Sequence, residues 1–162
     1  MATAIEIQKS LHAALSSMPD EQASLLPILH SIQDRLGYVP KDIVQDIAEH
    51  LHLSRAEVHG VITFYHHFRQ TPPAKHVVRV CRAEACQSMG GNALADHATR
   101  SLQTGFHGET ADGAITLEAV YCLGNCACAP SVMVGDTVHG RVSPQRFDEI
   151  VTSLRSALQE AA

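Results

Sequence analysis

Five cysteines, all between residues 81 and 128, carry the chemistry that this sequence indicates. Four of them form two close pairs, Cys81-x4-Cys86 and Cys122-x3-Cys126, with 35 residues between the pairs. Each iron of a 2Fe-2S cluster is tetrahedral and takes two thiolates beside the two bridging sulfides. Two cysteine pairs therefore favour one 2Fe-2S cluster in the second half of the chain.

Two other thiol chemistries remain open on ligand type alone. A structural zinc ion also takes four thiolates, although zinc sites more often have C-x2-C spacing on both sides, which neither pair shows. A thioredoxin-like dithiol catalyst would need a C-x-x-C motif, which is missing. Cys128 follows Cys126 so closely that spacing alone leaves open which is the ligand, and the other would be a small buried hydrophobe.

The other residues exclude several classes of function. The 11 histidines form no H-E-x-x-H motif or Cys-x-His pair, so surface or interface roles are favoured for them. The 12 basic residues are scattered along the chain and its net charge is -5, which argues against broad binding to the phosphates of nucleic acid. We expect no membrane insertion, because no apolar run approaches about 20 residues, and without a signal peptide the free thiols favour a cytoplasmic location.

Strands that end at the cysteines would bring the two pairs together. Val77, Val78 and Val80 lead into Cys81 as a buried strand would, and residues 115–121 predict a second strand ending at Cys122. A helix starting near Ser88 or Gly90 would direct the positive end of its dipole at the site. Gly-containing segments around the pairs would let backbone N–H groups approach an anionic cluster.

The rest of the second half predicts a hairpin and a helix. Valines at 132–134 and 138–142 flank the turn Gly135-Asp136, and Ser143-Pro144 has the residues of a helix start. The order is strand, helix, strand, hairpin, helix, which predicts a small sheet with helices packed on it over residues 76–160.

The first half is predicted to be a helical bundle. Ser24 is the expected N-cap of the second helix, Gly37 its stop, and Ser54 to Glu57 has the spacing of a capping box. Residues 71–74, Thr-Pro-Pro-Ala, then end helical periodicity and place the domain boundary after residue 72. Apolar stripes with helical spacing run over residues 7–18, 25–36, 43–51 and 58–68.

With the cysteines placed, the chain resembles the thioredoxin-like 2Fe-2S subunits of respiratory complex I, NAD-reducing hydrogenases and NAD-dependent formate dehydrogenases. The markers are L-H-S-I-Q at 29–33, G-Y-V-P at 37–40, V-I-T-F-Y at 61–65, and the C-x4-C and C-L-G-x-C cysteine pairs. The wording H-H-F-R at 66–69, C-R-A-E-A-C-Q-S at 81–88 and C-A-C at 126–128 looks most like the gamma subunit of soluble molybdenum formate dehydrogenase.

The resemblance implies an α+β fold, with an N-terminal helical bundle (residues 1–72) before a thioredoxin-like 2Fe-2S ferredoxin domain (residues 76–160). It implies that Cys81, Cys86, Cys122 and Cys126 hold the cluster and that Cys128 does not. It also implies a non-catalytic electron-transfer subunit docked on a flavoprotein that binds FMN and NAD, within a formate dehydrogenase complex whose molybdenum cofactor lies in another subunit. Consistent with this, the chain has no dinucleotide, P-loop or molybdenum-cofactor motif of its own.

Two rival functions remain. One is the equivalent 2Fe-2S subunit of NADH:quinone oxidoreductase or of an NAD-reducing hydrogenase, which would carry the same cluster. The other is a zinc-stabilised interaction module with no redox role.

Overall fold

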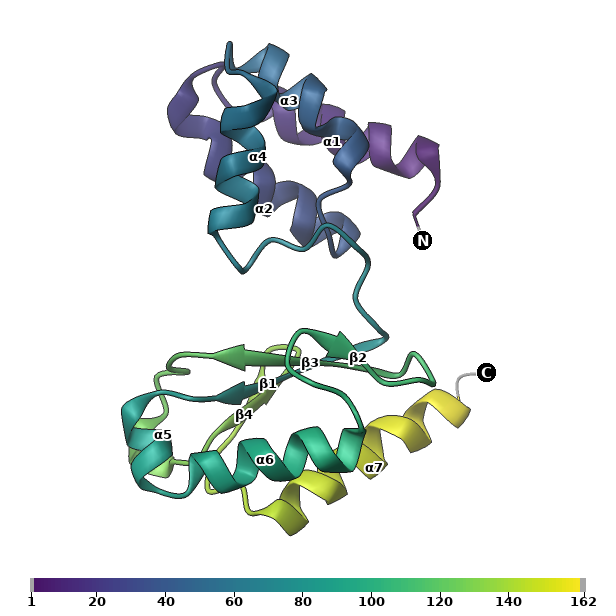
Figure 1. Ribbon diagram of the computed structural model, residues 1–162. Coiled ribbons are helices and arrows are strands. Elements are labelled where there is room, and N and C mark those ends of the chain that lie inside the picture. The colour runs from purple at the N-terminus through teal and green to yellow at the C-terminus, as the bar shows by residue number, and fades with distance from the viewer. Residues whose placement is uncertain (1, 161–162) are drawn as a thin grey trace. The chain divides into compact units, whose positions relative to one another are not determined.

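The chain forms two compact units, Met1–Pro72 and Pro73–Ala162, called here the N-terminal and C-terminal units. This computed structural model describes residues 2–160 (Figure 1). Within them, none of the helices combines the length and the apolar character that crossing a bilayer requires.

Local sequence signals set the ends of the helices in the N-terminal unit. The Ser54 hydroxyl accepts from the N–H of Glu57 at 3.2 Å, and the Glu57 carboxylate accepts from the N–H of Ser54 at 2.8 Å, so the predicted capping box is confirmed. Gly37 ends its helix with a φ of 81°, which a glycine adopts without a Cβ clash. The helices are α1 (Ala4–Ser16), α2 (Leu25–Leu36), α3 (Val44–His50) and α4 (Arg55–Phe64).

The predicted apolar stripes pack together as one core in this unit. Its fully buried members include Ile28, Leu29 and Ile32 of α2, Ile47 of α3 and Val58 of α4. Burial of this apolar surface is the main force that holds such short helices in place, because helices of this length are marginal alone.

One helix boundary differs from the prediction because a 3-10 turn precedes it. Ser24 occupies the N-cap position of α2, yet its side chain makes no capping bond. Residues Gln22–Ser24 form a 3-10 turn that runs directly into α2, so Ser24 already has helical backbone angles.

The apolar stripe that was predicted to continue to residue 68 is helical only to Phe64. Tyr65 turns to extended backbone angles, and the chain then folds back over α2. The buried amide of Gln33 holds the returning segment: it donates to the carbonyl of His67 at 2.8 Å and accepts from the N–H of Arg69 at 2.7 Å. Gln33 thus replaces the backbone bonds that a longer helix would have made.

The C-terminal unit is built on a mixed sheet with the strand order β2-β3-β1-β4-β5 over the described residues. β1 and β3 are parallel, and every other neighbouring pair is antiparallel. The strands are β1 (His76–Cys81), β2 (Gly108–Glu109), β3 (Ile115–Val120), β4 (Val132–Val134) and β5 (Thr137–His139).

Helices cover one face of this sheet. The crossover from β1 to β3 contains the short α5 (Glu84–Ser88) and α6 (Gly91–Leu102), and α7 (Pro144–Glu160) follows the hairpin. α6 and α7 lie beside each other on the same face (Figure 1). Their apolar stripes meet the buried strand residues, with Phe147 of α7 completely buried among them. This mixed α+β architecture agrees with the fold class expected from the sequence.

The hairpin is shorter than predicted. Its second strand ends at His139, and residues 140–142 turn away instead of continuing the strand. The N–H of Arg141 donates to the carbonyl of Cys128 at 2.6 Å and the N–H of Val142 to that of Pro130 at 3.0 Å. These bonds direct the chain to α7, which begins as predicted, with the Ser143 hydroxyl accepting from the N–H of Arg146. The two-residue β2 was not predicted, because it is too short to show a period.

Candidate metal centre

Parallel pairing of β1 and β3 brings the two cysteine pairs to one edge of the sheet. Cys81, the last residue of β1, is in register with Val120, the last residue of β3, and Cys122 follows two residues later. The short helix α5 then carries Cys86 back toward Cys81. The prediction that both pairs lie at the ends of neighbouring strands is confirmed.

The second pair already has the spacing of two ligands on one tetrahedral ion. The sulfur atoms of Cys122 and Cys126 are 3.7 Å apart. Metal–sulfur bonds of about 2.3 Å at a tetrahedral ion separate two thiolates by about 3.8 Å. Cys122 reaches this position with a φ of 100°, which is rare for a residue with a Cβ, and the N–H of Gly124 lies 3.4 Å from its sulfur.

The first pair is buried, and backbone groups surround it. Cys81 and Cys86 are each only 2% exposed. Burial by itself would raise the pKa of Cys81, but the backbone N–H of Ala83, the thiol of Cys86 and the N–H groups of Cys122 and Leu123 donate to its sulfur and together lower the pKa. The environment therefore stabilises a thiolate at Cys81.

The partner thiols respond in the opposite direction. Burial and the hydrogen bond to Cys81 raise the pKa of Cys86, although the N–H of Ser131 donates to its sulfur. The hydrogen bond shared with Cys122 raises the pKa of Cys126. In the metal-free chain Cys86 and Cys126 therefore hold their protons more firmly than a free thiol does, and metal binding would release these protons.

The backbone donors at this site were not predicted residue by residue. The sequence indicated only that Gly-containing segments would let N–H groups approach. Ala83, Leu123 and Ser131 contribute main-chain N–H groups, which every residue except proline has, so no side-chain signal marks them.

The start of α6 is seated directly on Cys86. A Cβ atom placed on Gly91 would lie 2.5 Å from the carbonyl oxygen of Cys86 and 2.7 Å from its carbonyl carbon. Only glycine fits at this contact, so Gly91 fixes how closely α6 approaches the site. The helix begins one residue after Gly90, close to the predicted start.

Cys128 is half-buried and packs against Gly140. Its Cβ lies against Gly140, where an added Cβ would approach within 2.7 Å. Its carbonyl accepts from the N–H of Arg141, and its N–H donates to the carbonyl of Asn125. Electrostatic interactions link Cys86 to Cys81 and Cys126, and Cys126 to Cys122 and Cys81.

The four thiols lie in two pairs, which is the ligand arrangement of a two-iron group. Among the described residues, no three histidine, cysteine or acidic side chains are close enough to hold a single metal ion. A sulfur–sulfur hydrogen bond joins the two thiols of each pair, and the N–H groups of Cys122 and Leu123 link the second pair to Cys81. This arrangement suits a group that accepts two ligands at each end. A 2Fe-2S cluster has that form.

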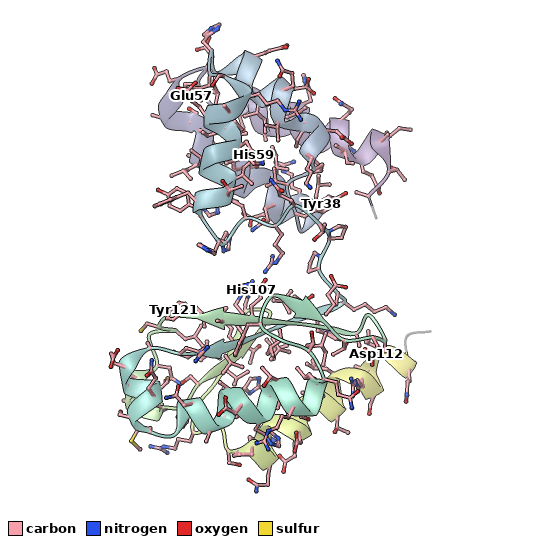
Figure 2. The ribbon with its side chains drawn as sticks, viewed as in Figure 1. Tyr38, Glu57, His59, His107, Asp112 and Tyr121 are labelled. Carbon is pink, nitrogen blue, oxygen red and sulfur yellow. The ribbon has the colours of Figure 1, made fainter. Side chains whose placement is uncertain are left out.

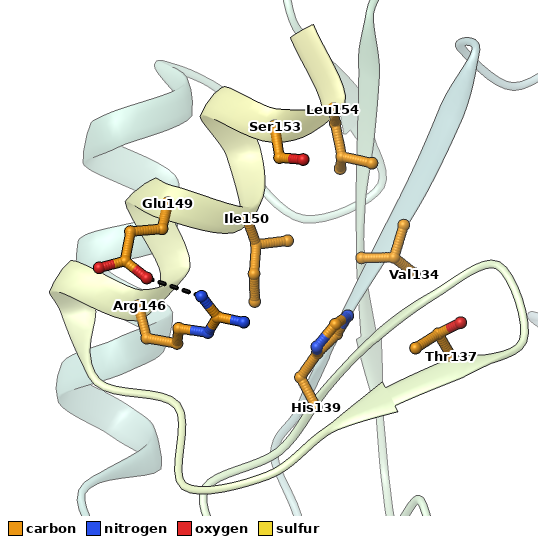
Figure 3. Close-up of a pocket in the computed structure, with 8 residues that line it drawn as sticks. All are labelled: Val134, Thr137, His139, Arg146, Glu149, Ile150, Ser153 and Leu154. Atoms are coloured by element: carbon orange, nitrogen blue, oxygen red, sulfur yellow. Dashed lines mark hydrogen bonds and ion pairs between the residues drawn. The ribbon is translucent and has the colours of Figure 1, made fainter. Parts of the chain in front are cut away.

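One side of the site is open. Cys122 and Cys126 are exposed, and the neighbouring Tyr121 is 74% exposed (Figure 2). A separate hollow of about 340 Å³ lies between β5 and α7 and is lined by His139, Arg146 and Glu149, among others (Figure 3). Its lining includes none of the five cysteines, so it does not belong to the metal centre.

Two curated proteins are similar in sequence to this chain over most of their length. The chain is 33% identical to the NADP-reducing hydrogenase subunit HndA of Solidesulfovibrio fructosivorans, over 85% of this chain and 80% of that one. It is 32% identical to a subunit of the NADH-quinone oxidoreductase of Rhizobium meliloti, over 93% of this chain and 90% of that one.

A solved structure shares the fold. The crystal structure of an air-oxidised NAD+-reducing NiFe-hydrogenase superposes with a TM-score of 0.67 at 22% identity, over 82% of this chain. The present chain spans 23% of the length of that hydrogenase chain. The family model described as thioredoxin-like 2Fe-2S ferredoxin matches residues 11–155, which include both cysteine pairs. The chain belongs to the thioredoxin-like 2Fe-2S ferredoxin family, whose members carry one 2Fe-2S cluster.

Proposed function

We propose that this chain is an electron-transfer subunit of a multi-subunit, NAD-linked oxidoreductase, with its single 2Fe-2S cluster on Cys81, Cys86, Cys122 and Cys126. The observation that carries the proposal is the meeting of two thiol pairs at the ends of two parallel strands. The relatives named above, which are subunits of a quinone reductase and of a hydrogenase, support the redox role.

The protein around the site would hold the cluster and tune it. The cluster, when bound, would supply one-electron chemistry. The backbone N–H groups of Ala83, Leu123 and Ser131 donate to thiolate sulfurs and would stabilise their negative charge. The buried first pair keeps water from one end, and the exposed second pair leaves the other end accessible to a partner.

We propose a flavoprotein that binds FMN and NAD as the partner on the electron path. The chain has no nucleotide-binding motif, so hydride chemistry would take place in that partner. The finer proposal is a formate dehydrogenase complex with a molybdenum catalytic subunit, which the wording of residues 66–69, 81–88 and 126–128 supports. The relatives named above favour the rival complexes, NADH:quinone oxidoreductase or an NAD-reducing hydrogenase.

Ligand substitutions test the site. We expect Cys81→Ala, Cys86→Ala, Cys122→Ala and Cys126→Ala to lose the cluster or hold it weakly, because each removes one of four thiolates. Cys128→Ser is the matched control and should keep it. Iron, acid-labile sulfide and the electron paramagnetic resonance signal of the reduced protein are the measurements. A colourless chain with zinc, or loss of iron in Cys128→Ser but not in Cys126→Ser, would contradict the assignment.

Purification from the native host identifies the complex. A tagged full-length chain should bring down a flavin-containing subunit, and molybdenum in the preparation would identify the formate dehydrogenase. Nickel or membrane-bound quinone reductase subunits would identify a rival. The isolated chain should oxidise neither formate nor NADH.

A further inference from the structure

The segments that carry the four cysteines contain very little charge. Arg82 and Glu84 are the only charged residues in the sequence from 80 to 95, and the stretch from 119 to 135 has none. Glu84 is exposed, whereas Arg82 is half-buried. Water screens a half-buried charge less than an exposed one, so Arg82 is the dominant full charge of these segments.

Contacts with the ring of Phe106 and with the end of β3 hold Arg82 in a defined position. Its guanidinium carbon lies 5.2 Å from the centre of the Phe106 ring, which packs against the core of the C-terminal unit. Its backbone N–H donates to the carbonyl of Val120 at 2.7 Å, which ties Arg82 to the end of β3. Nε is buried without a hydrogen-bond partner, and within residues 2–160 no acidic side chain forms an ion pair with it.

Such a charge would act on the reduction of the neighbouring cluster. Four thiolates and two sulfides give the cluster a negative charge, and reduction adds another. Arg82 directly follows the ligand Cys81, and adjacent Cα atoms are about 3.8 Å apart, so the two residues lie well within one Debye length, about 10 Å, of each other. The positive charge therefore favours the reduced cluster, against the net charge of -5 of the whole chain.

We propose that Arg82, held on the ring of Phe106, raises the reduction potential of the cluster; this rests on the function proposed above. A one-electron donor, such as a reduced flavin in the partner, gives one electron to the cluster, and no bond forms or breaks. Arginine stays protonated in both redox states, so no proton accompanies this effect. Arg82 tunes the potential and is not a ligand.

A redox titration of the full-length, cluster-loaded chain tests the proposal. The electron paramagnetic resonance signal of the reduced cluster is followed against the solution potential. Arg82→Gln should lower the midpoint, so that at the wild-type midpoint the ratio of reduced to oxidised cluster falls about three- to tenfold at low salt. Arg82→Lys should keep most of the wild-type potential. The shift should be the same at about pH 6 and about pH 8, because arginine stays charged at both.

Two other arginines give matched controls, because each substitution removes one charge from the same unit. Arg141→Gln removes the charge of an exposed side chain, on a residue whose backbone N–H donates to the carbonyl of Cys128. Arg100→Gln removes a charge that lies about 14 Å along α6 from the end of this helix at the site. Both should shift the midpoint less than Arg82→Gln. Equal shifts in the three variants, or no shift in Arg82→Gln, would overturn the proposal.

A variant at Phe106 provides a second test that does not depend on whether Arg82→Gln holds the cluster. Phe106→Leu keeps the charge but removes the ring, and it should lower the midpoint in the same direction by a smaller amount. An unchanged midpoint in Phe106→Leu would refute the role given to the ring. If the wild-type chain holds no 2Fe-2S cluster, the proposed function itself fails; if the cluster is normal and Arg82 is without effect, only the present inference fails.

Discussion

Replacing Gly91 by alanine should weaken both the C-terminal unit and its metal centre. The added Cβ would lie 2.5 Å from the carbonyl oxygen of Cys86, about 0.9 Å closer than the 3.4 Å at which ordinary van der Waals contact begins. The atoms it meets are backbone atoms, which no side-chain rotation can move aside. Either the start of α6 or residue Cys86 must therefore shift.

The expected cost follows from two opposing effects. Overpacking of this kind typically costs about 1–3 kcal/mol. Removing the backbone freedom of a glycine from the unfolded chain returns about 0.4–1 kcal/mol. We therefore expect Gly91→Ala to lower the free energy of unfolding by about 1–2 kcal/mol.

The effect on the cluster should be larger than the effect on the fold. Metal–ligand distances tolerate about 0.2 Å of error, and a displacement of Cys86 by several tenths of an ångström exceeds that. We expect less iron and sulfide per folded chain than in the wild type. Denaturant unfolding of the metal-free chain, followed by circular dichroism, separates the loss of stability from the loss of metal.

Gly60→Ala is the matched control. A Cβ on Gly60, inside α4, would meet no atom within 4 Å, and alanine is the better helix former by about 0.5–1 kcal/mol. This variant should be slightly stabilised and fully loaded. If Gly91→Ala matches Gly60→Ala in stability and iron content, the close packing of α6 on Cys86 does not constrain the site.

Two further predictions concern polar contacts away from the cysteines. Gln33→Leu should destabilise the N-terminal unit by about 1–3 kcal/mol, since two buried hydrogen bonds to the segment after Phe64 are lost. The control Gln45→Leu, on the exposed face of α3, should change the free energy of unfolding by less than about 0.5 kcal/mol. The hydrogen bond from His97 lowers the pKa of Asp148 below its usual value, so its stabilising contribution is complete above about pH 4 and is lost as the pH falls through the lowered pKa. Unfolding measured from about pH 6 to about pH 2 should therefore show a flatter acid limb for Asp148→Asn, and identical limbs would contradict the assignment.

The elements that sequence reasoning predicted well are those with long periodic patterns or strong local signals. The valines before Cys81 form β1, and the Ser54 capping box starts α4, because these signals act within a few residues. The strand-end placement of the cysteines also followed, since parallel strands joined by a helix end at the same edge.

The features that could not be predicted depend on contacts between distant residues. The amide of Gln33 holds the segment after Phe64 by a hydrogen bond to His67, which is 34 residues from Gln33 in the sequence. No residue near Phe64 indicates this contact. The left-handed backbone of Cys122 and the N–H group that Ser131 directs at Cys86 arise only once the sheet has formed. The pairing of Arg82 with Phe106 likewise joins a loop after β1 to one before β2.

The order of the cysteines along the chain also bears on when the centre can be assembled. During synthesis Cys81 and Cys86 leave the ribosome first, and at about 5–20 residues per second the second pair follows some seconds later. The N–H of Ser131 comes later still, and β4, which borders β1, begins only at Val132. Until then Cys81 and Cys86 lack the other two ligands and part of the structure that buries them. Their thiols are therefore open to oxidation or to binding by another metal ion. The cluster should therefore be inserted after the whole C-terminal unit has been synthesised and has folded.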